Sequence, residues 1–366
     1  MSASSFVPSQ ASRHFFTKAA YGGLRPTDVL AMSDDAAELM LAQARWGGDG
    51  SKQACPVCGL IDSHYRIRTR RQYTCRGCKH RFSVTSKTPL AWHKLSLQEV
   101  IYYIVQQAAA AKGKSSLEMA RGMAACVSTT YVLGMKLRQA IHAYQSALTL
   151  EGEVEMDGAY INTYVRPHRV KAERKDGRKK EHTNPDKRCV FVMRQRSGEP
   201  GKGALKTVAA IILSENEADI RKLVGKHVRP GSTIYTDQNA AYNALHGYYD
   251  VKSVNHDEEF STANEGGINQ NQAESFHLRV RRMVMGQTHK AGPHFEMYAS
   301  EMAFREDTRR MSKAEIVGLM LKCLLTAPLS QGFTKYGRVP SNEEGTLVKS
   351  SNDAGTGNVI PMPKAA

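Results

Sequence analysis

The apolar residues in the first half of the chain recur at helical spacing. Ser96 and Ser115 are each followed three residues later by a glutamate, and then by apolar residues three and four positions apart. These Ser-x-x-Glu capping boxes predict helices in LQEVIYYIVQQAAAA and in SLEMARGMAACVSTTYVLGMKLRQAIHAY, the second broken around 124–128. An earlier segment, SDDAAELMLAQARW, predicts one more helix.

Beyond Gly152 the pattern changes to strands that alternate with helices. Five segments predict strands: EVEMDGAYI, CVFVMRQR, ALKTVAAIIL, STIYTD and VKSVNH. SENEADIRKLVGKHV, capped by Ser214 and Glu217, and NAAYNALHGYY predict helices, and two or three more are expected from about 271 to 327. Strands first and then alternation with helices indicate a mixed α/β domain over 150–330.

Composition completes the expected organisation. The regions are an N-terminal helical and partly flexible segment (1–50), a cysteine module (51–90), a helical segment (91–149), the α/β domain (150–330) and a disordered tail (331–366) rich in Ser, Asn, Gly and Pro.

The net charge of +16 favours nucleic acid as partner. The apolar stretches are too short to span a bilayer, and the N-terminus lacks a signal peptide's apolar core.

The seven cysteines fall into two groups. In the reducing, cytoplasmic compartment that the missing export signal implies, none should form a disulfide. Cys126, Cys189 and Cys323 lie in apolar surroundings and are expected in the core. The other four form two Cys-x-x-Cys pairs, whose thiolates suit the charge and tetrahedral geometry of Zn²⁺. Such a closed site is structural, and the spacing predicts a zinc ribbon held by Cys55, Cys58, Cys75 and Cys78.

Arginines dominate the segment HYRIRTRRQY between the two cysteine pairs. Strand alternation would place Tyr65, Ile67 and Thr69 on one face and Arg66, Arg68 and Arg70 on the other. The arginine face would contact DNA phosphates. Two alternatives remain: the arginines form a solvated hairpin face, or the ribbon binds another protein.

The broken helix after the ribbon has helix-turn-helix character. Leu117 and Ala120 are expected to face inward on the first helix, and the second helix begins with Ser128, Thr129 and Thr130. Short polar side chains at that end of a recognition helix reach bases or phosphates in a major groove. An ordinary helical hairpin would give the same periodicity, but the neighbouring basic ribbon favours DNA binding.

Three carboxylates stand out in the α/β domain. Asp157 ends the first strand, Asp237 ends the fourth strand, and Glu274 lies near the start of a later helix. Strand ends of such a sheet gather at one edge, where three oxygen donors would bind two Mg²⁺ ions for phosphodiester chemistry. Arg281, seven residues after Glu274, shares its helix face and would hold a DNA phosphate; Arg279 and Arg282 lie beside it.

Each carboxylate also has an ordinary structural interpretation. Asp157 before Gly158 suits a turn, and Asp237 suits a helix cap. Glu274 suits the third position of a helix that begins near Asn271. The ordered set of three, in this topology, is what favours catalysis over these alternatives.

The order of several segments resembles bacterial insertion-sequence transposases of the zinc-ribbon, ISXO-like group. The segments are CPVCG, CRGCKHRFS, SSLEMAR, TTYVLGMKLR, MDGAYINTYVRP, STIYTDQNAAYNAL, VNHDEEFS, NQAESFHLRVRR and HFEMYASEMAFREDTRR. The resemblance covers about residues 45–315, which is most of the chain. The resemblance implies an RNase H-like, integrase-type core and a DDE triad at Asp157, Asp237 and Glu274. It also implies catalytic Mg²⁺, with Mn²⁺ as a substitute.

The resemblance extends to a few further positions and has departures. His256, Glu301 and Arg305 match recurrent family residues, and Arg281 matches the basic residue after the glutamate. Relatives with Asn as third ligand leave Asn271 as an alternative to Glu274. Many relatives have an acidic residue where this chain has Gly158, and the basic stretch 166–188 is long for a hairpin.

These observations together predict a transposase. It would bind the terminal inverted repeats of its element, hydrolyse the phosphodiester at each end, and join the freed 3′-hydroxyls to target DNA in the nucleoid. Joining two ends requires at least a dimer on DNA. The alternatives are a non-enzymatic zinc-ribbon DNA-binding regulator and an inactive, domesticated relative.

Overall fold

The computed structural model describes residues 23–62, 64–161, 188–199, 203–254, 271–287, 292–330 and 332–333. The predictions for the first 22 residues, for most of the basic stretch 166–188 and for nearly all of the tail lie outside these residues. The chain divides into two compact units, Met1–Leu137 with Thr308–Thr334 and Arg138–Asp307 with Lys335–Ala366, and each is described by itself. No helix in the described part of the chain is long and apolar enough to cross a membrane.

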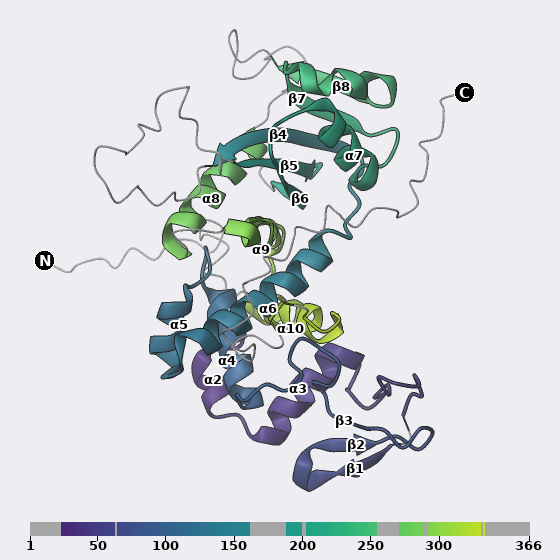
Figure 1. The fold of residues 1–366 in the computed structure, drawn as a ribbon, viewed down its shortest axis with the longest axis vertical. Coiled ribbons are helices and arrows are strands. Elements are labelled where there is room, and N and C mark those ends of the chain that lie inside the picture. The colour runs from purple at the N-terminus through teal and green to yellow at the C-terminus, as the bar shows by residue number, and fades with distance from the viewer. Residues whose placement is uncertain are drawn as a thin grey trace, which may run out of the picture. The chain divides into compact units, whose positions relative to one another are not determined.

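The first unit contains a helical cluster and a small sheet (Figure 1). Its helices are α2 (Pro26–Leu30), α3 (Asp34–Trp46), α4 (Leu97–Ala109), α5 (Ser116–Met123), the first part of α6 (Val127–Gln145) and α10 (Lys313–Thr326). The side chain of Ser96 accepts a hydrogen bond from the amide of Glu99, and that of Ser115 from the amide of Glu118, so both predicted helix starts are confirmed.

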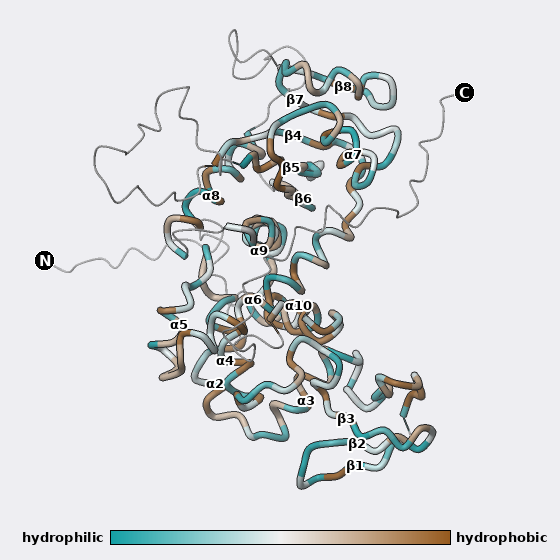
Figure 2. Tube along the Cα trace, in the orientation of Figure 1, coloured by the Kyte–Doolittle hydropathy of each residue, from teal (hydrophilic) through white to brown (hydrophobic). Residues whose placement is uncertain are grey.

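Helix α10 packs on α3 and α4 and is rich in apolar residues (Figure 2). Its buried residues include Val317, Met320, Leu321 and Leu324. The α/β domain was expected over 150–330, but Thr308–Thr334, which include α10, belong to the first unit.

The small sheet has the antiparallel order β1 (Tyr65–Ile67), β2 (Gln72–Thr74), β3 (Arg81–Phe82). The expected strand through Arg70 is wrong, because Ile67 pairs with Gln72 and the residues between them form the connection. Arg68–Arg70 form a 3₁₀ turn, closed by Arg71 in the left-handed conformation (φ 47°). The arginines therefore do not share one strand face.

The second unit contains a five-stranded mixed sheet of order β6-β5-β4-β7-β8. The strands are β4 (Glu153–Ile161), β5 (Arg188–Arg196), β6 (Ala204–Ile212), β7 (Thr233–Asp237) and β8 (Asp250–Val254), and all five predicted strands are confirmed. β5 is antiparallel to its neighbours β4 and β6, whereas β4, β7 and β8 are mutually parallel. The helical elements are α7 (Glu217–His227), the 3₁₀ helix η6 (Ala240–Gly247), α8 (Asn271–Gln287), the 3₁₀ turn η7 (Gly292–His294) and α9 (Phe295–Thr308).

Alternate residues of β4 face different layers. Val154 and Met156 join the apolar core made with α7 and η6, which also contains Phe191 of β5. Glu155 and Asp157 instead contact α8. Because strand side chains alternate in direction, the odd-numbered residues of β4 form the α8 face of the sheet.

Several local predictions are corrected. Helix α7 is capped by Asn216, whose side chain accepts from the Asp219 amide, and not by Ser214. Leu117 is 50 % exposed, and the inward residues of α5 are Met119 and Ala120. Cys126 is exposed, whereas Cys189 and Cys323 are buried as expected.

Candidate functional site

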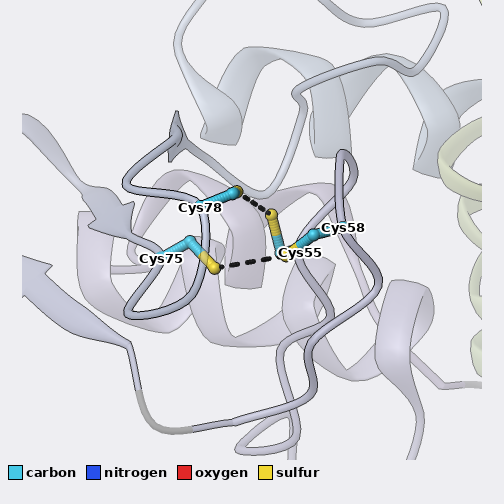
Figure 3. Close-up of side chains that lie close together, drawn as sticks. All are labelled: Cys55, Cys58, Cys75 and Cys78. Atoms are coloured by element: carbon cyan, nitrogen blue, oxygen red, sulfur yellow. Dashed lines mark hydrogen bonds between the residues drawn. The ribbon is translucent and has the colours of Figure 1, made fainter.

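The four cysteines of the ribbon converge on one point (Figure 3). Their sulfur atoms all lie within 4.8 Å of one another, with Cys55 Sγ 3.6 Å from Cys78 Sγ and Cys58 Sγ 3.5 Å from Cys75 Sγ. Four thiolates at this separation suit a structural Zn²⁺.

Both cysteine knuckles have the same backbone geometry. The Gly59 amide donates to Cys55 O at 2.9 Å, and the Lys79 amide donates to Cys75 O at 3.0 Å. Gly59 (φ 74°) and Lys79 (φ 57°) both adopt the left-handed conformation that this turn needs. The repeated turn explains how two distant Cys-x-x-Cys segments present paired thiols to one ion.

The ribbon is fastened to α3 through a buried glutamate. Glu38 is 3 % exposed and accepts hydrogen bonds from Arg66 Nη2 at 2.8 Å and from the Tyr73 hydroxyl at 3.2 Å. Arg71 pairs with Asp34 of the same helix at 2.8 Å. Arg66 therefore has a structural partner, while Arg68 and Arg70 are exposed in the 3₁₀ turn.

The α5–α6 turn presents only part of the predicted polar set. Ser128 is exposed and Thr129 is half-buried, but Thr130 is fully buried. The Thr130 hydroxyl donates to Ser116 O at 2.8 Å and to Val127 O at 3.0 Å. Thr130 therefore holds the two helices together and is not on the surface.

Asp157 lies in the middle of β4, and not at the end of the strand as expected, while Asp237 is the last residue of the adjacent parallel strand β7. The ladder between β4 and β7 pairs Glu153 with Thr233 and ends where Glu155 meets Tyr235. Asp157 and Asp237 each lie two residues beyond this last pair, and strand alternation places both side chains on the α8 face. Asp237 Oδ1 accepts the Asn239 amide at 3.2 Å, which is a turn-forming contact. The residue that caps η6 is Asn239, so the alternative interpretation of Asp237 as a helix cap is wrong.

Helix α8 packs on β4 and β5 and carries Glu274 in its first turn. Glu274 is exposed and shares the outer face of the helix with Leu278, Arg281 and Arg282. On the buried face, His277 Nε2 lies 3.3 Å from Asp157 Oδ2. The helix that carries the third carboxylate therefore touches the first one.

The three carboxylates do not converge as closely as the cysteines. Among the described residues, the cysteine cluster is the one group of three or more His, Cys, Asp or Glu side chains placed closely enough to hold a metal ion. The donor chemistry of Asp157, Asp237 and Glu274 nevertheless suits Mg²⁺, which takes carboxylate oxygens and keeps several waters.

A fourth carboxylate, Glu215 after β6, lies beside the first two and was not predicted. A Cβ at Gly158 would lie 2.7 Å from Glu215 Cδ, so the glycine makes room for it. The Tyr242 hydroxyl donates to Glu215 Oε1. Burial raises the pKa of the Glu215 carboxyl, and the charges of Asp237 and Asp157 add to that rise against the Tyr242 hydrogen bond. Glu215 thus adds negative potential next to the strand carboxylates.

The remaining predicted residues are divided between surface and interior. Arg281 and Arg282 are exposed, whereas Arg279 forms an ion pair with the buried Glu306. Glu301 is 2 % exposed and pairs with Arg138 at 2.7 Å and with Arg305 at 2.6 Å, so it has a structural role within the second unit. Asn271 is exposed as the first residue of α8, and His256 lies outside the described residues.

Two domain families match this arrangement. Residues 149–307, which contain the sheet and Glu274, match the ISXO2-like transposase domain. Residues 32–81, which contain α3 and the ribbon, match the transposase zinc-ribbon domain. The chain is therefore a DDE transposase by class. It belongs to the ISXO2-like transposases that carry a zinc ribbon, as the sequence resemblance indicates. Comparisons with curated proteins and with solved structures give no match.

Proposed function

We propose that this protein cuts the ends of an insertion sequence and joins them to target DNA through a carboxylate site made of Asp157, Asp237 and Glu274. The observation that carries the proposal is the parallel pairing of β4 and β7, because Asp157 and Asp237 each lie two residues beyond its last pair and α8 touches Asp157 through His277. The strand order with an antiparallel second strand supports an RNase H-like, integrase-type core.

In this proposal Asp157, Asp237 and Glu274 would hold two Mg²⁺ ions, which would supply activation of water or of a 3′-hydroxyl and stabilisation of the leaving oxygen. Arg281 and Arg282, exposed on the same helix face as Glu274, bind the DNA backbone near the scissile phosphate. Asn271 remains the alternative third ligand. Because two ends must be joined, the active form on DNA is at least a dimer.

End recognition belongs to the first unit. Arg68 and Arg70 of the ribbon, and Ser128 and Thr129 at the start of α6, are the accessible members of the predicted DNA-binding set. The zinc ion holds the ribbon's shape and takes no part in the reaction.

The test is nicking of duplex DNA that carries the inverted repeats flanking the gene. Mg²⁺-dependent nicks at the repeat ends, absent with EDTA and absent on scrambled ends, would support the proposal. Tight binding to the ends with no nick in Mg²⁺ or Mn²⁺ would instead support a DNA-binding regulator.

A further inference from the structure

A buried glutamate of β4 is bound to the first turn of α8. Glu155 is 0 % exposed and lies two residues before Asp157 on the same face of the sheet. Its Oε2 accepts hydrogen bonds from the amides of Gln272 at 3.0 Å and Ala273 at 3.3 Å, while its Oε1 accepts from Arg196 Nε at 2.7 Å. Both oxygens of the Glu155 carboxylate therefore accept hydrogen bonds.

These bonds have a clear physical basis. The first amides of a helix have no partner within the helix, and a negative charge is favoured there. A buried carboxylate persists when it is paired and fully hydrogen-bonded, which Arg196 and the two amides together achieve. The first turn of α8 is thus fixed to β4 by a charged contact.

A second strand strengthens the same attachment. Arg194 of β5 is 4 % exposed, and its Nη1 donates to Gln272 O at 2.6 Å. The start of α8 is therefore held through its amides by β4 and through a carbonyl by β5. Glu274 follows Ala273 directly, so it is the next residue after the anchored pair.

We propose that Glu155 is a positioning residue that fixes the start of α8 on β4 and thereby sets Glu274 relative to Asp157. This role rests on the proposed function, because Glu274 matters as a ligand only in that reaction. Glu155 does not itself contact the reacting atoms.

Amide hydrogen exchange tests the attachment without any DNA or metal. In Glu155→Gln the single side-chain oxygen cannot serve both Arg196 and the helix amides, so the Gln272 and Ala273 amides should exchange at least about tenfold faster. Glu153→Gln is the matched control, because Glu153 pairs with the same Arg196 at 3.6 Å from an exposed position. Exchange at these amides that is equal in the two variants would overturn the proposal.

Nicking measured on the same proteins tests the consequence. Glu155→Gln should nick about tenfold or more slowly at unchanged affinity for end DNA, and Glu153→Gln should nick like the unsubstituted protein. Fast exchange in Glu155→Gln combined with normal nicking would also overturn the positioning role. If the unsubstituted protein does not nick, the proposed function fails, whereas the exchange result still decides whether Glu155 anchors α8.

A second variant covers the case in which Glu155→Gln does not fold. Glu155→Met combined with Arg196→Met removes the buried Glu155 charge together with its partly buried partner, and folded proteins often tolerate such a replacement of an ion pair. The double variant still lacks the acceptor for the α8 amides, so the same exchange and nicking results are expected from it. Slow exchange at Gln272 and Ala273 in the folded double variant would contradict the anchor.

Discussion

His277 Nε2 lies 3.3 Å from Asp157 Oδ2, so α8 contacts the strand carboxylate through a residue one turn beyond Glu274. The histidine is 2 % exposed, and neither ring nitrogen has a hydrogen-bond partner among the described residues. Buried polar side-chain atoms normally have at least one polar partner. For His277 Nε2, the polar atom within reach is Asp157 Oδ2. We infer that His277 orients the Asp157 carboxylate.

Replacement of His277 by phenylalanine should separate this role from packing. His277→Phe fills the space with a ring but removes the polar contact, and we expect nicking to fall roughly 10- to 100-fold, as for lost partners of metal ligands. The affinity for end DNA should not change. His277→Gln keeps a donor and should recover part of the rate in single-turnover assays. Equal rates for His277→Phe and the unsubstituted protein would refute the role.

Removal of one ribbon cysteine should abolish zinc binding. Cys75 is fully buried in the four-cysteine cluster, so Cys75→Ser should lower bound zinc from about one ion per chain to none and unfold the ribbon. Cys126→Ser is the control, because Cys126 is exposed and lies outside the cluster. Metal analysis by mass spectrometry measures the ion, and end binding should weaken in Cys75→Ser alone. Retained zinc in Cys75→Ser would contradict the assignment.

The ribbon arginines should differ in their effect on DNA binding. Arg68 and Arg70 are exposed, so the double variant Arg68→Ala/Arg70→Ala should weaken binding and reduce the slope of log affinity against log salt by about 2. Arg66→Ala should change that slope less, because Arg66 is bonded to Glu38. A larger loss of slope in Arg66→Ala than in the double variant would show that the Glu38 contact opens on DNA.

Asp307 should make the stability of the second unit depend on pH. Burial raises the pKa of its carboxyl to about 7, and its Oδ2 accepts from the Thr207 amide at 2.9 Å and from Gln145 at 3.2 Å. The folded chain therefore binds this proton more tightly than the unfolded chain. The proton on Asp307 therefore stabilises the fold. This stabilisation is complete below about pH 4 and is lost as the pH rises through 7.

The variant Asp307→Asn removes this titration. Relative to the unsubstituted protein, it should gain on the order of 2 kcal/mol in the free energy of unfolding between pH 5 and pH 8. Urea denaturation at the two pH values measures the difference, and the comparison cancels the other titrating groups. An identical pH dependence in both proteins would show that Asp307 is ionised throughout.

Periodicity and capping were sufficient to predict much of the fold. The five strands, the helix starts at Ser96 and Ser115 and the cysteine cluster each depend on residues close in sequence. The 3₁₀ turn at Arg68 was missed because alternation alone does not show where a hairpin turns. The packing of α10 on α3 was missed because it joins segments more than 250 residues apart.

The environment of the carboxylates could not be predicted in the same way. Glu215 and His277 become neighbours of Asp157, and Glu155 meets the first turn of α8, only after the sheet and α8 assemble. Their local patterns resemble ordinary surface or core positions. The glycine after Asp157 was a usable signal, since a missing side chain in a strand often marks a close approach by another group.

In the proposed reaction Asp157 and Asp237 perform the chemistry, while the first unit binds the DNA ends. The most direct measurement compares Asp157→Asn, Asp237→Asn and the unsubstituted protein on labelled end DNA with Mg²⁺, scoring both binding and strand-transfer products. We predict that each variant binds the ends with unchanged affinity and forms at least about 1,000-fold less product. Strand transfer at the normal rate in either variant would contradict the account.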